Sequence, residues 1–189
     1  TVFNVSQCDD IKLPKKSKNA PKKPLKVLTD AEVVVENYIA SESGLELIIR
    51  KSDRAYFRPS ADEIVVPTMR QFVDEAQSKK ESVMDGKQHY YSTLFHEMVH
   101  STGTKNRCNR DGVAKVSFFG SHEYSKEELV AEIGSAILGC KVGITSERVI
   151  NNTKAYCQSW AKKLESEPKW IVWAGGRSEK AVKYILGEK

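Results

Sequence analysis

The stretch TLFHEMVHSTG, from Thr93 to Gly103, places two of the chain's four histidines four residues apart, with a glutamate directly after the first. Residues i and i+4 of a helix lie on one face with their Cβ atoms about 5–6 Å apart, so His96 and His100 can reach the same metal ion. Glu97 lies about 100° further around the helix, where it can reach a water molecule on that ion. The spacing therefore predicts two metal ligands and a general base, the pattern written H-E-x-x-H.

The surrounding residues predict a helix from Lys87 to Thr102, and Gly103 stands where a glycine commonly follows a helix end. Apolar side chains recur at helical spacing and would hold this helix in a core: Tyr91, Leu94, Phe95, Met98 and Val99. The alternative is a buried helix whose histidines form hydrogen bonds without a metal.

A third ligand has to come from elsewhere, because a catalytic zinc ion takes three protein ligands and leaves its fourth position to water. His89 lies about two turns before His96, too far along the helix to converge with it. The segment SKEELVAEIGSA offers Glu128 and Glu132, one turn apart on a second predicted helix, and His122 precedes them. We favour Glu128 as the third ligand, with Glu132 or His122 as alternatives.

Glu128 has a second interpretation, because Ser125 and Glu128 also fit the first and last positions of a capping box at a helix start. Against this, Leu129, Ile133 and Ile137 mark a buried side of the same helix. Buried carboxylates are costly unless a cation or hydrogen-bond donors meet them. One glutamate on the metal and the other hydrogen-bonded to a ligand histidine would satisfy both.

The remaining pattern predicts an α+β fold, with a small antiparallel sheet followed by helices. The first helix is expected to begin at a capping box, Thr29–Glu32. The expected strands cover residues 45–50, 55–57 and 63–66, and the later helices cover 69–76, 126–140, 146–164 and two short segments near Trp170 and 181–186. The second and third strands read as a hairpin, and residues 104–124 read as a loop.

The composition is typical of a folded globular protein, with 40% hydrophobic and 29% charged residues. No run of 18 apolar residues predicts a membrane span, and the N-terminus has no secretory signal. The four cysteines are scattered, which argues against a disulfide framework or a zinc ribbon and favours the cytoplasm. Because the first residue is not Met, we expect the chain to be a piece of a longer protein.

Residues 1–26 form a basic segment that contains prolines. They hold seven lysines and two acidic residues, so their excess of five equals the formal net charge of +5 of the whole chain. Such a segment is either a solvated tether to an upstream module or an arm that binds the phosphates of nucleic acid. The folded domain is expected to span residues 27–189.

More specific segments are spread over most of the chain: VFNV near the start, AYFRPSADEIVVP, YYSTLFHEMVHSTG, NRCNRD, FFGSHEYSKEELVAEIGSAIL and AYCQSWAKKLESEPKWI. Together they resemble the zincin-like metallopeptidase domain at the C-terminal end of ArdC-type antirestriction proteins of plasmids and phages. More distantly, the chain is similar to ImmA/IrrE-type metallopeptidases. The resemblance implies a cytoplasmic, gluzincin-like enzyme with one Zn²⁺ on His96, His100 and Glu128 and with Glu97 as the base.

The resemblance also implies that a protein or peptide is the substrate, and that a single-stranded DNA-binding domain lies upstream of this chain. In the expected chemistry, zinc acidifies a water molecule, Glu97 takes its proton, and a further donor stabilises the oxyanion. Candidates for that donor lie between the two metal-binding helices: Tyr124, His122, Arg107 and Arg110.

The strand from Glu63 to Val66 could pair with an extended substrate if it lies at a sheet edge. An alternative function is a non-catalytic, zinc-stabilised domain of a DNA-binding antirestriction protein, and a third is a protease that cleaves a repressor. Glu97 favours an enzyme, because a purely structural metal site has no use for a base.

Overall fold

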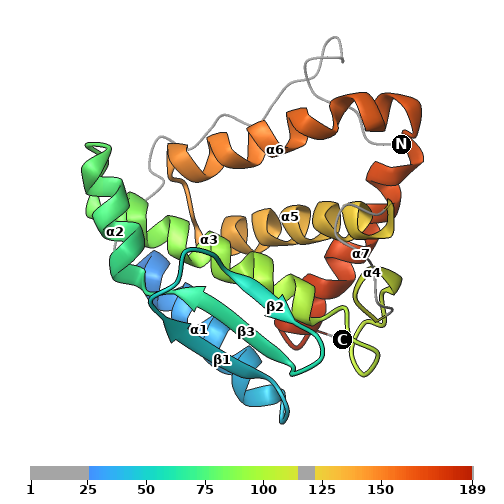
Figure 1. Ribbon diagram of the computed structural model, residues 1–189, viewed down its shortest axis with the longest axis horizontal. Coiled ribbons are helices and arrows are strands. Elements are labelled where there is room, and N and C mark those ends of the chain that lie inside the picture. Colours follow the sequence, from blue (N-terminus) through green and yellow to red (C-terminus); the bar gives the residue numbers. More distant parts are fainter. Residues whose placement is uncertain (1–25, 115–121, 189) are drawn as a thin grey trace, which may run out of the picture.

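The order of helices and strands follows the predicted class. The computed structural model describes residues 26–114 and 122–188 (Figure 1). Its elements are α1 (Lys26–Ser41), β1 (Glu46–Arg50), β2 (Tyr56–Arg58), β3 (Glu63–Pro67), α2 (Met69–Ser78), α3 (Val83–Ser101), α4 (Asp111–Ala114), α5 (His122–Val142), α6 (Glu147–Ser166) and α7 (Lys169–Ile185). The α+β prediction is confirmed. Within these two ranges, every helix is too short or too polar to cross a bilayer.

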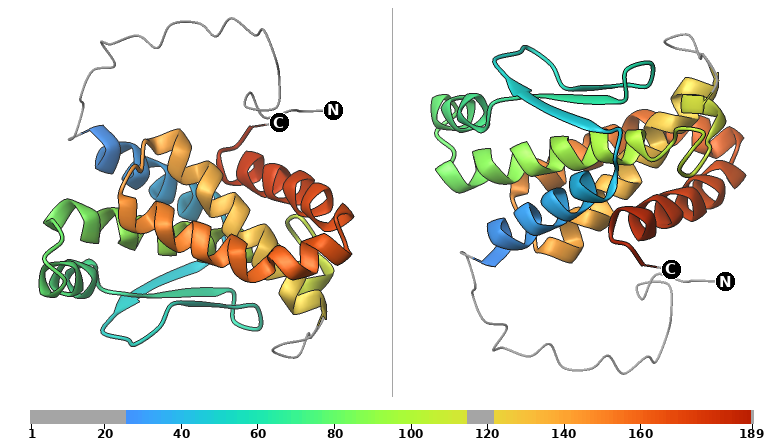
Figure 2. Two further views of the ribbon diagram at one scale, coloured as in Figure 1. Left: turned by 90° about the horizontal axis from the view of Figure 1, so that it is seen from above. Right: turned by 90° about the horizontal axis from the view of Figure 1, so that it is seen from below.

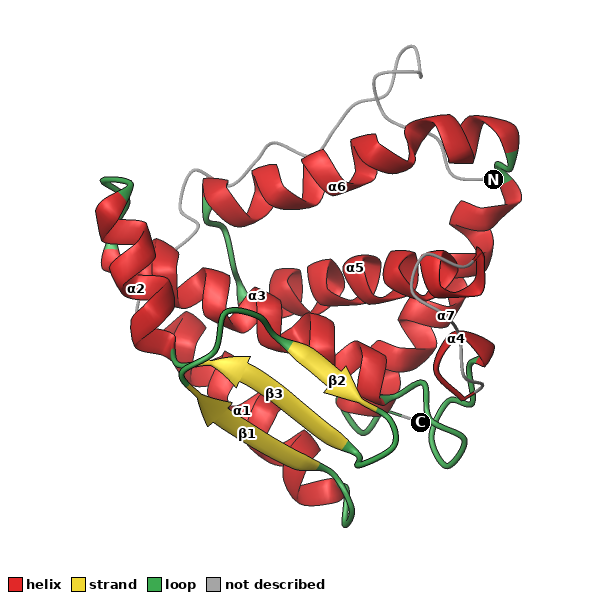
Figure 3. Ribbon diagram, viewed as in Figure 1, coloured by secondary structure: helices red, strands yellow, loops and turns green. Residues whose placement is uncertain are grey.

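The sheet is mixed rather than antiparallel, which corrects the prediction. Its strand order is β1-β3-β2, with β3 parallel to β1 and antiparallel to β2 (Figure 3). The hairpin of β2 and β3 is confirmed. β3 takes the middle because Ile64, Val65 and Val66 are all buried, whereas neither β1 nor β2 has a fully buried residue. The expected substrate pairing along Glu63–Val66 is therefore wrong, since both edges of β3 are already paired.

Helix α3, which carries the H-E-x-x-H pattern, runs through the centre of the molecule. It packs against β2 and β3 on one side and against α5 on another (Figure 2). It begins at Val83, four residues before the expected start, because Ser82 and Asp85 cap it reciprocally. The Ser82 hydroxyl accepts the Asp85 amide at 3.0 Å, and the Asp85 carboxylate accepts the Ser82 amide at 3.1 Å. The five apolar residues expected to anchor this helix are all buried.

Helix α5 lies unusually close to α3 at Gly134. A Cβ atom at this position would stand 2.8 Å from Val99 Cγ2 and 3.1 Å from Val99 Cγ1. Ordinary carbon contacts are about 3.5–4.0 Å, so only glycine lets the two helices come this near without displacing Val99. The closeness brings the carboxylates at the start of α5 to the histidines of α3.

Several helix boundaries differ from the sequence expectations. α1 begins at Lys26, so Thr29 lies inside the helix rather than capping it. α5 begins three residues before Ser125, which removes the second expected capping box. α4 lies in the expected loop, and α7 is one helix instead of two short ones. Its Gly175 and Gly176 do not break it, and an added Cβ at either would meet nothing within 4 Å. The expected VFNV strand and the basic segment up to residue 25 lie outside the described residues.

Candidate metal centre

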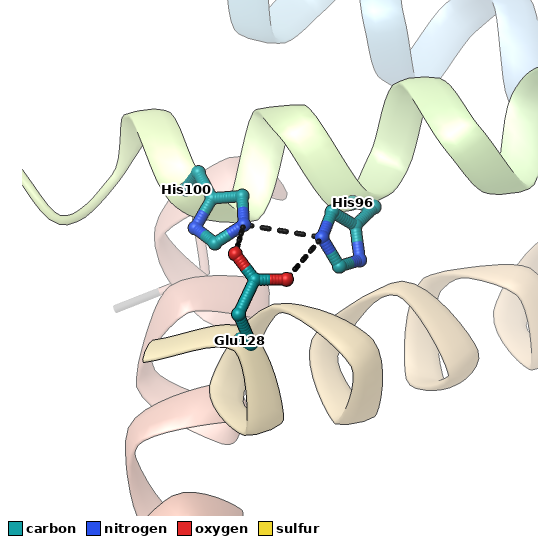
Figure 4. A group of neighbouring side chains, drawn as sticks. All are labelled: His96, His100 and Glu128. Atoms are coloured by element: carbon teal, nitrogen blue, oxygen red, sulfur yellow. Dashed lines mark hydrogen bonds and ion pairs between the residues drawn. The ribbon is translucent and has the colours of Figure 1, made fainter. Parts of the chain in front are cut away.

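Two histidines of α3 and one glutamate of α5 point toward a common position (Figure 4). The Nε2 atoms of His96 and His100 are 3.1 Å apart. The Glu128 carboxylate lies against both, with Oε2 3.5 Å from His96 Nε2 and Oε1 3.4 Å from His100 Nε2. Ligand-type atoms of the three residues all lie within 4.8 Å of one another. Of the candidates for a third ligand, the structure thus brings Glu128 to both Nε2 atoms.

The other ring nitrogen of each histidine faces a further glutamate of α5. Glu127 Oε1 lies 3.3 Å from His100 Nδ1, and Glu132 Oε2 lies 3.4 Å from His96 Nδ1. An ionised carboxylate only accepts hydrogen bonds, so both contacts favour the imidazole proton on Nδ1. In the neutral imidazoles both Nε2 lone pairs then face the position between the two rings and Glu128, where a cation could accept them.

Glu127 is held from its far side by Arg110 in a bidentate ion pair. Arg110 Nε donates to Glu127 Oε2 at 2.8 Å and Nη2 donates to Oε1 at 2.6 Å, and the two side chains are only 4% and 2% exposed. The same guanidinium donates to Thr102 Oγ1 and to the Val99 carbonyl, both at 2.7 Å. Each of its nitrogens has a partner, which argues against Arg110 among the four candidates for the oxyanion donor.

The contact of Glu127 with His100 was not predicted from the sequence, because the i, i+4 spacing of Glu128 and Glu132 placed the expected histidine contacts on those two residues. The available signal was an acidic residue two positions before the apolar pair Leu129 and Val130, on a side of the helix that is buried in the structure. Glu132, in contrast, has the histidine contact that was expected for one of the two glutamates in ELVAE.

The three side chains fit a small divalent cation. Zinc binds nitrogen and carboxylate oxygen at about 2.0–2.2 Å, and tetrahedral angles then separate neighbouring ligand atoms by about 3.3–3.6 Å. The three contacts among His96, His100 and Glu128 measure 3.1, 3.5 and 3.4 Å. Two unprotonated nitrogens at such a distance repel each other unless a cation lies between them. The two contacts of Glu128 lie within this spacing and the contact between the two Nε2 atoms is slightly shorter, so the residues fit a small divalent cation.

The carboxylates also act on the histidine protons. Burial alone would lower the pKa of both imidazoles, but hydrogen bonds to Glu128 and Glu132 raise the pKa of His96, and those to Glu127 and Glu128 raise the pKa of His100 to about 10. Burial would raise the pKa of Glu128, but the two imidazoles hold it well below its usual range. A metal ion must therefore compete with protons for this site.

Glu97 lies beside these residues in the wall of a cavity of about 660 Å³, which is also lined by β2 and α4. Its side chain is buried, at 7% residue exposure, and this burial raises its pKa, while a hydrogen bond from the Phe57 backbone acts in the opposite direction. Phe57 belongs to β2, whose outer edge pairs with no strand among the described residues. The expected base and a free strand edge therefore face the same cavity as the three ligand-type side chains.

The remaining expected residues lie elsewhere or are not described. Arg107 donates to both oxygens of Asp62 at 2.7 and 2.6 Å and to Glu42 at 2.6 Å, so it is not free to stabilise an oxyanion. His122 and Tyr124 lie in the first turn of α5, but their side chains fall outside the described part of the structure. Their roles stay predictions.

Comparisons with known proteins point to a family and to several relatives. The family described as zincin-like metallopeptidase, MPTase-PolyVal, matches residues 34–177. Two proteins named DNA primase TraC from Escherichia coli are 35% and 34% identical over 186 residues, which is 98% of this chain but 11% and 15% of theirs. The uncharacterized protein y4eC of Sinorhizobium fredii is 29% identical over 191 residues, covering 100% of this chain and 53% of its own length.

Crystal structures of the antirestriction protein ArdC from the R388 plasmid are also similar. The Mn(II)-bound structure has a TM-score of 0.56 at 26% identity and covers 85% of this chain and 51% of that one. The metal-free structure has a TM-score of 0.57 at 26% identity and covers 98% of this chain and 58% of that one. The expected likeness to ArdC-type proteins is confirmed. The chain spans between about a tenth and somewhat over half of the length of these relatives.

Proposed function

Because the chain belongs to the zincin-like metallopeptidase family, we propose that it hydrolyses peptide bonds, with one zinc ion on His96, His100 and Glu128 and with Glu97 as the general base. The observation that carries this proposal is the convergence of three ligand-type side chains within 4.8 Å, beside a buried glutamate in an open cavity. When bound, zinc supplies a Lewis acid that acidifies water and polarises a carbonyl group.

Glu97 has the surroundings that a proton-transfer group needs. Burial raises its pKa, which brings the carboxylate closer to the pH at which it can both take up and release a proton. In the proposed reaction it accepts a proton from the attacking water and returns it to the departing amine. The Phe57 amide holds the carboxylate, and Tyr124 in the first turn of α5 is the proposed donor to the oxyanion.

The proposed substrate is a protein segment in extended conformation. The free edge of β2 borders the cavity that contains Glu97, and an exposed strand edge can pair with an extended peptide through backbone hydrogen bonds. This edge replaces the strand that the sequence suggested for the same purpose.

Zinc is proposed over other divalent ions because of the donor set. Two imidazoles and one carboxylate at tetrahedral spacing are typical of catalytic zinc, whereas manganese favours oxygen ligands. One ArdC structure is described as Mn(II)-bound, so both metals belong in any assay.

We further propose that the domain works within a longer cytoplasmic protein that acts on DNA. Support comes from the names of the relatives, a DNA primase and a plasmid antirestriction protein, and from the scattered cysteines. Single-stranded DNA would be bound chiefly by a separate domain and weakly by the lysines of residues 1–26. Gel-shift titration of this chain with single-stranded DNA should give only weak binding that disappears with added salt.

The peptidase proposal is tested with the metal-loaded chain, unfolded β-casein and a mixed peptide library, with new peptide ends read by mass spectrometry. The wild type should cleave, and Glu97→Gln should bind zinc equally well without cleaving. The same substitution at an exposed glutamate of α1, Glu36→Gln, should leave cleavage unchanged. Cleavage that is identical in the wild type and Glu97→Gln, or absent from the zinc-loaded wild type, would support the non-catalytic alternative and overturn the proposal.

A further inference from the structure

We infer that Arg110 is a positioning residue which, through Glu127, orients the His100 ring for metal binding. The inference rests on the proposed metal site and adds a residue that makes no contact with the metal position itself. The contacts that carry it begin in the loop that follows α3, pass through the buried ion pair of Arg110 and Glu127, and end at His100 Nδ1.

The loop after α3 is folded back on itself, so that Arg110 returns to the helix end. The Cys108 amide donates to the Thr102 carbonyl at 2.7 Å, and the Arg110 amide donates to the Gly103 carbonyl at 2.9 Å. A Cβ at Gly103 would stand 2.5 Å from Val113 Cγ2, so the loop closes tightly only with glycine there. The backbone therefore places Arg110 independently of the ion pair that its side chain makes.

The ion pair transmits this position to Glu127. A guanidinium presents two parallel N–H groups that match both oxygens of a carboxylate, which a lysine ammonium cannot do. Glu127 Oε1 accepts from Arg110 Nη2 at 2.6 Å and also faces His100 Nδ1 at 3.3 Å. Because Glu127 Oε1 takes part in both contacts, the position of Arg110 determines where the hydrogen-bond acceptor of the His100 imidazole lies.

The orientation of His100 follows from this anchor. Its Nδ1 is held by Glu127, which directs Nε2 to Glu128 and His96. Groups that hold the outer nitrogen of a ligand histidine commonly change metal affinity by roughly 10- to 100-fold. The glutamate behind His96 instead has a hydrogen bond with a threonine, Thr153, as its further partner. The effect of Arg110 should therefore pass through His100 alone.

The test measures the zinc dissociation constant by competition with a chromogenic chelator. Glu127→Gln and Arg110→Met should each raise the Kd roughly 10- to 100-fold. The double variant should bind no more weakly than Glu127→Gln alone, because the other contacts of Arg110, to the Val99 carbonyl and to Thr102, reach no ring nitrogen of a ligand histidine. Arg110→Lys keeps the charge but loses the two parallel N–H groups, so its zinc Kd should lie between those of the wild type and Arg110→Met.

Arg107→Met is a matched control. Arg107 is buried to the same degree as Arg110. It pairs with both oxygens of Asp62 and donates to the Ser101 carbonyl at the end of α3. Its ion pairs do not involve the glutamates near the metal position, which are Glu97, Glu127, Glu128 and Glu132. It should lose thermal stability without a change in Kd. If Arg110→Met shifts the Kd no more than Arg107→Met does, the inference is overturned while the metal site stands.

Two further results separate the possible failures. A wild type that binds no zinc, or a His96→Ala variant that binds it as tightly as the wild type, would remove the proposed function first. If Arg110→Met does not fold, Arg110→Lys and Glu127→Gln decide, and an unchanged Kd in both overturns the inference.

Discussion

Replacing Gly134 by alanine should separate the two helices that carry the centre. The new Cβ would stand 2.8 Å from Val99 Cγ2, about 0.7 Å closer than the shortest ordinary carbon contact. Overpacking of this kind costs about 1–3 kcal/mol, whereas glycine to alanine within a helix contributes about 0.8–1.0 kcal/mol of stability. Gly176→Ala in α7 isolates the second effect, because its Cβ would meet nothing within 4 Å.

Urea unfolding followed by circular dichroism compares the two variants. Gly134→Ala should be about 1–3 kcal/mol less stable than Gly176→Ala, which corresponds to about 2–12 °C in Tm for a domain of this size. Val99→Ala removes the methyl groups that the new Cβ meets, so the double variant should be more stable than the sum of the single effects. Equal stability of Gly134→Ala and Gly176→Ala would refute the close packing of α3 on α5.

Four further predictions concern protons, metal and the core. Zinc affinity should fall as the pH is lowered, because the raised pKa values of His96 and His100 give protons an advantage there, and titrations at pH 6, 7 and 8 check the slope. In EDTA, the raised pKa of His100 stabilises the fold fully below about pH 6.5, the usual pKa of histidine, and this contribution is lost as the pH rises toward 10. Unfolding at pH 9 should therefore need less urea than at pH 6.5. Free zinc at 100 times its Kd should add about 2.7 kcal/mol, or about 5–11 °C in Tm, and a scan with and without EDTA measures it. Tyr38→Phe should cost about 0.5–1.5 kcal/mol, because Tyr38 and Ser101 share a buried 2.8 Å hydrogen bond, and it should leave the zinc Kd unchanged.

The part of the centre that lies within one helix was predictable from the sequence. The spacing of His96, Glu97 and His100 on a 3.6-residue helix fixes which faces they occupy, whatever the helix packs against. The role of Glu128 as third metal ligand was harder to predict, because the same residue also fitted a helix cap. The choice between the two roles depended on where α5 begins. That boundary was misplaced, since a helix can extend beyond a plausible cap when nothing in the sequence stops it.

Features that depend on how elements meet were beyond the sequence pattern. The sequence of a short strand does not indicate which strands lie on its two sides, so the central position of β3 was known only from the structure. Its apolar run Ile64, Val65 and Val66 is nevertheless typical of a central strand. Arg110 was visible as a charged loop residue, but its buried partner Glu127 depends on how α5 crosses α3. Gly134 was the clearest unused signal, because a glycine inside a helix often marks a close approach.

The most direct test is the metal content of the purified chain after zinc loading and dialysis, measured by elemental analysis. The prediction is one zinc ion per chain in the wild type and in Glu97→Gln, and none in His96→Ala or Glu128→Ala. A wild type without metal, or an unchanged zinc content in both His96→Ala and Glu128→Ala, would contradict it.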